Sequence, residues 1–273
     1  MAECVREATG FSGYVDLEEE SLYYRYKQVV ANVTQYFRQN EWQGAARVFA
    51  ALAWEPLTSI YAGMAIQKGK SPSYTLSGMN PEVLTEKEKM QTPILLLHGR
   101  GGSQGMFEEM GAFFEQEGIG PVFTVNLTDG ELNEGDFDIV EAKIQEIQKL
   151  YGREVKIDLV GYSRGAEFAL YMALPKENWW IEEGGKCYLF PSTSWRNEVG
   201  KVIRIGSMTL QKEWNQLSSD MYDSIYEIKG RDDLHMPEPS YAKNRIDIDG
   251  VGHVGLVSSP LVFEKLKQIL RSQ

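Results

Sequence analysis

Short apolar runs alternate with amphipathic stretches over most of the chain from residue 93 onward. Runs typical of strands are PILLLH at 93–98, PVFTVNL at 121–127, VKIDLVGYS at 155–163, KVIRIGS at 201–207, SIYEIKG at 224–230 and RIDID at 245–249. Helical spacing connects them, at 106–116, at 137–152 and from about Arg164 to Leu174, and a closing helix begins at Ser259 and Pro260. This order predicts an α/β fold with a mostly parallel sheet flanked by helices, whose ligands bind beyond the carboxyl ends of the strands.

The first 91 residues have a different pattern, which predicts an N-terminal helical extension and a connector ahead of a core at 92–273. Asp16 and Glu19 are typical of a helix start, and apolar residues follow at helical spacing up to Phe37. A second helical stretch covers about 42–67, and a Gly- and Pro-containing connector with the charged run TEKEKMQ follows it.

Residues 46–66 are apolar over nearly the span of a bilayer, which raises the alternative of a transmembrane helix. Glu55 and Pro56 lie in the middle of this stretch. A charge there costs roughly 3 kcal/mol, and proline interrupts a helix. A buried helix, a helix pair or an apolar flap over a site is therefore the favoured interpretation.

Composition and charge exclude several classes of function. The 273 residues carry 28 Lys and Arg against 39 Asp and Glu, a net charge of −11, which disfavours nucleic acid as a partner. Two cysteines, Cys4 and Cys187, and three histidines predict neither a disulfide framework nor a metal site. The N-terminus has no apolar signal region, so a cytoplasmic location is expected.

The most informative motif is Gly161-Tyr162-Ser163-Arg164-Gly165. A G-x-S-x-G match by itself is weak, but this one directly follows an apolar strand and opens a helix. That context is the one in which a serine is held in a strained turn with its hydroxyl exposed at the sheet edge. Ser163 is therefore the candidate nucleophile, and a strand-to-helix turn with an incidental serine is the plainer alternative.

A serine nucleophile needs a base and a group that orients the base. The histidines are His98, at the end of the first strong strand, His235 in a loop, and His253 between two glycines after the last strand. His253 fits best, because it completes the order serine, acid, histidine along the chain.

The acid is expected in the loop that follows SIYEIKG. The loop shape G-x-x-D-x-x-x-P favours Asp233, and Asp232 stays open because one residue of offset lies within the error of such an assignment. Charge that develops on a carbonyl oxygen also needs preorganised N–H donors. The main-chain N–H groups of Arg100, in HGRGG, and of Arg164 are the candidates.

The stretches PILLLHGRGGS, IDLVGYSRGAEFALYMA and IDGVGHVGLVSSPLVFEKLKQIL resemble those of α/β-hydrolases, the small bacterial lipases and esterases in particular. The resemblance covers about residues 92–273. It implies an α/β-hydrolase fold and hydrolysis of carboxylic esters through Ser163, Asp233 and His253, with no cofactor. Tyr162 and Arg164 stand where those lipases usually have His and Met or Gln, which leaves the acyl-chain preference open.

Residues 175–199 form an expected insertion that could act as a lid, with Trp179 and Trp180 as candidate substrate-binding residues. The expected partner is a small acyl ester, and a transient contact with a lipid surface stays open. Two other functions also stay open: a thioesterase or peptidase with the same triad, and a hydrolase-fold binding module.

Overall fold

The computed structural model describes residues 62–71, 74, 78–128, 134–174, 181–183, 186–188, 198–207, 219–231, 233 and 242–272. The predicted helix at 16–37, and all of the apolar stretch 46–66 before residue 62, lie outside the described residues. Within the described parts of the chain, no helix combines the length and the hydropathy needed to cross a membrane.

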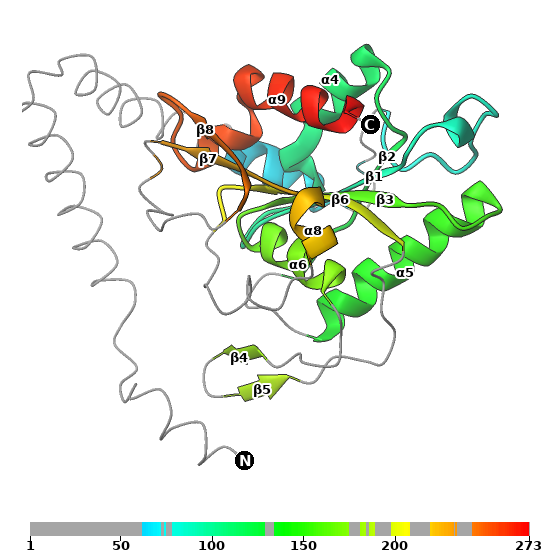
Figure 1. Cartoon of the computed structure of the whole chain (residues 1–273), viewed down its shortest axis with the longest axis horizontal. Helices are drawn as coiled ribbons and strands as arrows, with labels where there is room; N and C mark the ends of the chain where they lie inside the picture. The colour runs from blue at the N-terminus through cyan, green and yellow to red at the C-terminus, as the bar shows by residue number, and fades with distance from the viewer. Residues whose placement is uncertain are drawn as a thin grey trace, which may run out of the picture.

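A six-stranded parallel sheet forms the centre of the molecule (Figure 1). Its strands, in the order β2-β1-β3-β6-β7-β8, include every predicted strand: β1 (Ile94–Leu97), β2 (Val122–Thr124), β3 (Ile157–Tyr162), β6 (Val199–Ile205), β7 (Ile225–Gly230) and β8 (Asn244–Ile248). Each neighbouring pair in this order is parallel. The predicted fold class is therefore confirmed.

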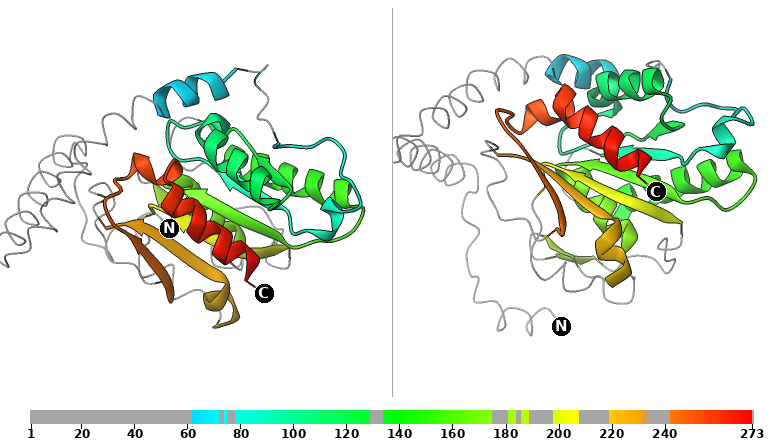
Figure 2. Two further views of the ribbon diagram at one scale, coloured as in Figure 1. Left: turned by 90° about the horizontal axis from the view of Figure 1, so that it is seen from above. Right: turned by 45° about the horizontal axis from the view of Figure 1, so that its top comes forward.

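Helices cover both faces of the sheet (Figures 1 and 2). One face carries α4 (Glu108–Glu117) and α9 (Pro260–Arg271), and the other carries α5 (Glu134–Tyr151) and α6 (Arg164–Ala173). Successive residues of β1 enter opposite cores, since Ile94 and Leu96 pack under α4 and α9 while Leu95 and Leu97 pack under α5 and α6. This two-sided burial explains why β1 is a continuous apolar run.

Several short elements were not predicted from the sequence. They are the 3-10 helices η1 (Glu88–Met90), η2 (Gln104–Phe107) and η4 (Val254–Val257), the helix α8 (Ser219–Ser224), and the antiparallel pair β4 (Ile181–Glu183) and β5 (Lys186–Tyr188). The β4–β5 pair lies within the predicted insertion 175–199. Its expected role as a lid stays a prediction.

A helical segment at 62–69 packs on the loop that follows β1. The Ser103 hydroxyl donates to the carbonyl oxygen of Ile66 over 2.9 Å, and Lys68 pairs with Glu108 at 2.7 Å. A Cβ atom on Gly105 would lie 2.0 Å from the carbonyl oxygen of Ala65. The absence of a side chain at Gly105 thus allows this close approach.

The two edge strands of the sheet, β2 and β8, differ in what lies along them. Outside β2, Met79 forms a parallel bridge with Val122, and the Asn80 amide donates to the Val122 carbonyl oxygen over 2.9 Å. On β8, Arg245 and Asp247 are exposed on one face and pair with each other at 2.8 Å. One edge is therefore covered by chain and the other carries charge.

Candidate active site

The predicted site residues follow strands that end at one edge of the sheet. Ser163 follows β3, Asp233 lies beyond β7 and His253 lies beyond β8. The chain passes from β1 to β2 on one side and to β3 on the other, so the order of strands reverses between β1 and β3. In open parallel sheets, ligands bind at the carboxyl ends beside such a reversal.

Ser163 has a strained backbone, with φ 53° and ψ −121°. Its amide donates to the carbonyl oxygen of Ile205 over 2.8 Å, which ties the turn to the end of β6. A Cβ atom on Gly161 would lie 2.2 Å from the Gly165 carbonyl oxygen, and one on Gly165 would lie 2.0 Å from the Leu97 carbonyl oxygen. Both glycines of the motif are therefore required for the close packing of β3, α6 and β1 around this serine.

His253 and Asp233 form a buried pair, with 2.8 Å between Nδ1 of the imidazole and Oδ2 of the carboxylate. The side chain of Asp233 is 0% exposed and that of His253 is 10% exposed. A carboxylate accepts hydrogen bonds only, so Nδ1 carries the proton, and in a neutral ring Nε2 is then the unprotonated nitrogen. The imidazole is therefore in the tautomer that a general base needs.

The imidazole of His253 lies next to the end of β6, where the Ser163 turn is anchored. A Cβ atom on Gly206 would lie 3.2 Å from both Cε1 and Nδ1 of His253. The Tyr162 ring also packs against the imidazole, with 5.1 Å between ring centroids, and its hydroxyl donates to the His253 carbonyl oxygen. Tyr162, which precedes the serine, and Gly206, which follows Ile205, thus both lie against the imidazole of His253.

The loop after β1 lies over Ser163. Gly99 to Gly102 form a turn in which the Gly102 amide donates to the Gly99 carbonyl oxygen over 3.1 Å, and Gly101 has φ +67°. A Cβ atom on Gly99 would lie 2.9 Å from Cβ of Ser163. The turn therefore brings the backbone at Gly99 close to the serine, and Arg100, the expected donor, is the next residue along the chain.

His98 has both ring nitrogens in hydrogen bonds to the main chain. Nδ1 lies 2.8 Å from the Gly99 carbonyl oxygen, and Nε2 accepts the Leu127 amide over 2.8 Å. The residue is 1% exposed. These contacts assign His98 a role in holding loops, which supports the choice of His253 as the base. His235, Asp232, Trp179 and Trp180 lie outside the described residues.

Buried charged side chains near the site were not singled out from the sequence. On the α6 face of the sheet, Arg204 of β6 faces Glu227 of β7, with 3.8 Å between Nη1 and Oε1, and both residues are at most 1% exposed. Ser207 donates to the same carboxylate over 3.0 Å. Burial lowers the pKa of the nearby Lys229, and the charge of Glu227 opposes this. The signal available in the sequence was the alternation of charge with isoleucine in KVIRIGS and SIYEIKG.

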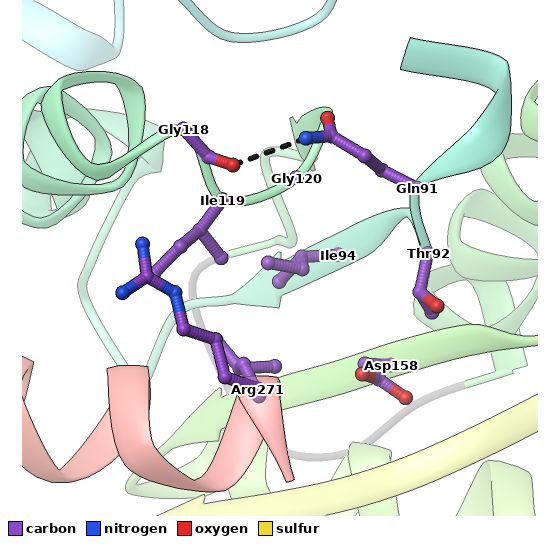
Figure 3. Close-up of a pocket in the computed structure, with 9 residues that line it drawn as sticks. Gln91, Thr92, Ile94, Gly118, Ile119, Gly120, Asp158 and Arg271 are labelled. Carbon is purple, nitrogen blue, oxygen red and sulfur yellow. Dashed lines mark hydrogen bonds between the residues drawn. The ribbon is translucent and has the colours of Figure 1, made fainter. Parts of the chain in front are cut away.

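A cavity of about 210 Å³ lies at the opposite, amino edge of the sheet (Figure 3). It is bounded by the start of β1, the Gly118–Gly120 turn, Asp158 of β3 and Arg271 of α9. Burial raises the pKa of the Asp158 carboxyl, although the Lys201 amide donates to it over 2.7 Å. None of the described residues that line the cavity is a serine, cysteine or histidine, so the carboxyl edge is the better candidate for catalysis.

No protein-family model matches the chain, and no curated protein matches it in sequence. Among solved structures, lipase BlEst2 of Bacillus licheniformis in its propeptide form is 15% identical, with a TM-score of 0.48, over 71% of this chain and 53% of that one. The present chain thus spans about half the length of that form.

Two further solved structures are similar to a comparable degree. A soluble variant of monoglyceride lipase from Saccharomyces cerevisiae is 14% identical, with a TM-score of 0.45, over 72% of this chain and 89% of that one. The Pyrococcus furiosus esterase Pf2001 is 14% identical, with a TM-score of 0.43, over 70% and 90%. At these identities the likeness concerns the fold alone.

Proposed function

We propose that this chain is a serine hydrolase that cleaves carboxylic esters through an acyl-enzyme on Ser163, with His253 as general base and Asp233 as orienting acid. The observation that carries the proposal is the buried contact of 2.8 Å between His253 and Asp233, together with a serine that is held at positive φ and bonded to the end of β6, where the imidazole also packs. An incidental serine needs neither the strain nor an oriented imidazole next to it.

In the first half of the reaction, the Ser163 hydroxyl oxygen attacks the ester carbonyl carbon while Nε2 of His253 takes its proton. Asp233 stabilises the imidazolium through the hydrogen bond that it accepts from Nδ1. The main-chain N–H groups of Arg100 and Arg164 stabilise the negative carbonyl oxygen. The carbon–oxygen bond to the alcohol then breaks, and His253 returns the proton to the leaving oxygen.

In the second half, water takes the place of the alcohol. His253 accepts one proton of the water, whose oxygen attacks the acyl carbon, and the bond to Ser163 breaks as the serine oxygen regains a proton. The products are a carboxylic acid and the free enzyme. The net charge of −11 favours uncharged esters over anionic ones. We expect Trp179 and Trp180 of the insertion to contact the acyl chain.

The test is labelling with a fluorophosphonate probe, which reacts with activated serines. The parent chain should be labelled on Ser163, Ser163→Ala should not be labelled, and Ser272→Ala, at the far end of α9, should be labelled like the parent. Hydrolysis of p-nitrophenyl esters of increasing chain length then defines the acyl preference. Labelling that persists in Ser163→Ala would exclude the proposed nucleophile, and turnover of thioesters or peptides alone would change the substrate class.

A further inference from the structure

We infer that Thr128, Asp136 and Arg164 form a buried oxyanion brace, a set of side-chain contacts that fixes the two proposed oxyanion donors relative to each other. The inference rests on the proposed function, because it assigns these residues to the N–H groups of Arg100 and Arg164. They are positioning residues, since they act on those donors through the backbone.

The guanidinium of Arg164 points away from solvent into the protein. It pairs through Nη2 with Oδ2 of Asp136, and Nη1 donates to the Thr128 carbonyl oxygen over 3.2 Å. The side chain is 6% exposed and also stacks over the Phe168 ring at 5.3 Å. A residue whose amide is a candidate donor is thus anchored by its own side chain, one position after the nucleophile.

The carboxylate of Asp136 connects three separate parts of the chain. Its Oδ1 accepts the Thr128 amide over 2.7 Å, and its Oδ2 accepts the Thr128 hydroxyl over 3.0 Å as well as the Arg164 guanidinium. The side chain is 0% exposed. Asp136 therefore ties the beginning of α5, the loop after β2 and the Ser163 turn together, and charge-assisted bonds of this kind are the stronger ones in proteins.

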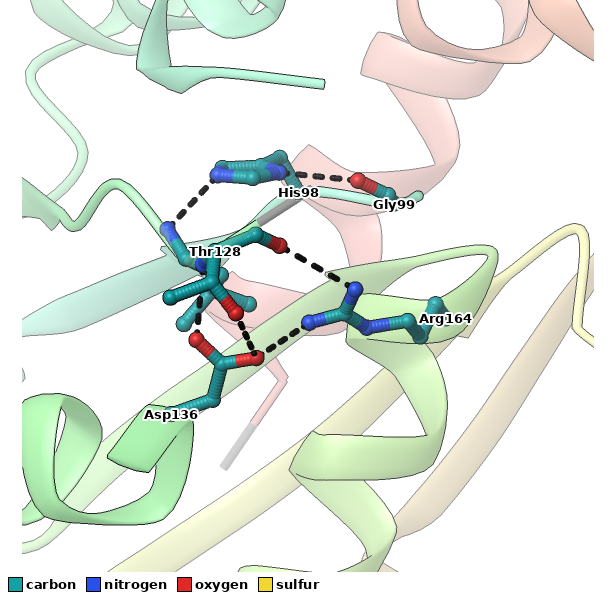
Figure 4. Close-up of polar contacts among 6 residues, drawn as sticks. His98, Gly99, Thr128, Asp136 and Arg164 are labelled. Atoms are coloured by element: carbon teal, nitrogen blue, oxygen red, sulfur yellow. Dashed lines mark hydrogen bonds and ion pairs between the residues drawn. The ribbon is translucent and has the colours of Figure 1, made fainter. Parts of the chain in front are cut away.

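The same short stretch, Leu127–Thr128, also holds the other donor loop. The Leu127 amide donates to Nε2 of His98, and Nδ1 of His98 contacts the Gly99 carbonyl oxygen, one residue before Arg100 (Figure 4). Both donor segments are thus fastened to two adjacent residues, one through His98 and the other through the Arg164 guanidinium.

The sheet does not supply this connection. The register of β1 and β3 ends at the pair Leu97 and Gly161, before either donor loop begins. A buried ion pair is often no more stabilising than apolar packing of the same size, so stability alone is a weak reason for it. Fixing the distance between two donors is a reason that an apolar cluster would serve less well, because transition-state stabilisation depends on donor placement within fractions of an ångström.

The experiment compares Asp136→Asn with Glu146→Gln, a matched change of carboxylate to amide on the same helix. Glu146 pairs with Lys143 on the surface of α5. For Asp136→Asn we expect kcat on a p-nitrophenyl ester to fall by about 10- to 100-fold, with KM within about twofold. The Glu146→Gln variant should match the parent in both.

Two ketones separate positioning from folding. The Ser163 oxygen adds to the carbonyl carbon of a trifluoromethyl ketone while its proton passes to His253, which places an oxyanion between the donors. The matching methyl ketone binds without this addition. In Asp136→Asn, the affinity for the trifluoromethyl ketone should fall by the same factor as kcat falls. The affinity for the methyl ketone should stay as in the parent. Rates are expressed per serine labelled by the fluorophosphonate, so that unfolded protein does not count.

Two milder sets of variants keep the inference testable if Asp136→Asn folds poorly. Thr128→Val removes one hydroxyl contact at nearly constant size and should lower kcat by about fivefold. Arg164→Lys keeps the charge and one donor group, so it should retain more activity than Arg164→Met. Unchanged rates per labelled serine in Asp136→Asn or, where that variant does not fold, in Thr128→Val would overturn the inference. A parent that is not labelled on Ser163 would instead overturn the proposed function.

Discussion

At the scale of single residues, Ser163 is the position where local strain and chemistry meet. Its angles, φ 53° and ψ −121°, are sparsely populated by residues with a Cβ atom and cost about 1–3 kcal/mol. The Ile205 carbonyl oxygen and the tight packing at Gly161 and Gly165 hold this conformation in place. The strained backbone fixes the direction of the Cα–Cβ bond of Ser163, because that direction cannot change without moving the start of α6.

This strain should be measurable by comparing two replacements of Ser163. Glycine adopts positive φ without the Cβ penalty, whereas alanine keeps it. We expect Ser163→Gly to have a free energy of unfolding about 1 kcal/mol above that of Ser163→Ala, with both inactive toward esters. Urea unfolding followed by circular dichroism provides the comparison. A glycine variant that is the less stable of the two would mean that the turn is not strained.

Replacement of the buried carboxylate should affect the rate more than binding. Asp233→Asn leaves an amide against Nδ1 of His253, which favours the wrong tautomer and stabilises the imidazolium poorly. We expect kcat to fall by about 10³- to 10⁴-fold. Asp232→Asn is the matched control, because the sequence alone left these neighbours open, and the opposite ranking of the two variants would move the acid by one residue.

At the scale of elements, the strands and helices could be predicted because each carries its own periodic signal. β1 and β3 are buried on both faces, and α9 begins at Ser259 and Pro260 as expected, with proline in the first turn. The β4–β5 pair and α8 have only three to six residues per element, too few for a period to be read. Their formation depends on contacts that are distant in the sequence.

The candidate site was predictable to the level of residue type and order, and less so in its supporting contacts. Asp233 was favoured from its loop, and its bond to His253 supports that choice. Whether His98 or His253 can act as a base depends on which atoms surround each ring, and a sequence does not contain that information. The pairing of Arg164 with Asp136, 28 residues apart, was hidden for the same reason.

Asp158, near the amino end of β3, gives a prediction about pH. Burial raises the pKa of its carboxyl above the ordinary 3.8, so the folded state binds this proton more tightly than the unfolded chain. Its contribution to stability is therefore greatest below pH 3.8 and is lost as pH rises through the higher folded value. At neutral pH the ionised carboxylate is destabilising.

Asp158→Asn removes this titration while it keeps an oxygen for the Lys201 amide. We expect the variant to have a higher Tm than the parent at pH 7, and the difference to shrink toward zero below about pH 3. The exposed Asp223→Asn is the control and should change Tm little at either pH. If Asp158→Asn instead has a lower Tm than the parent at pH 7, the contacts of the ionised carboxylate offset the cost of burying it.

At the scale of the whole molecule, the expected boundary at residue 91 is crossed by close contacts. The helical segment 62–69 lies against η2 through Gly69 and Gly105, and Asn126 donates to the Gly69 carbonyl oxygen over 3.3 Å. Hydrophobic periodicity predicted a helix near this segment but not its docking, because glycine-to-backbone contacts leave no apolar pattern. At least this part of the extension is built into the core beside the loop after β1.

Two glycine-to-alanine changes test this docking. Gly105→Ala places a methyl group against the Ala65 carbonyl oxygen and should cost about 1–3 kcal/mol of unfolding free energy. Gly63→Ala lies in the 62–69 helix with nothing within 4 Å and should gain about 0.5–1 kcal/mol. If Gly105→Ala is as stable as the parent, the 62–69 helix does not pack against the core in solution.

The contacts at the two sheet edges bear on whether copies of the chain can pair through their edge strands in concentrated solution. A bare edge strand is a template on which a second molecule can add its own strand, and such growth leads to fibres. Outside β2, Met79 pairs with Val122, and Asn80 bonds to the Val122 carbonyl oxygen and to the Thr124 amide. On β8 an incoming strand would have to bury the Arg245–Asp247 pair. The sheet that carries the candidate site is therefore protected against self-templated growth at both of its described ends.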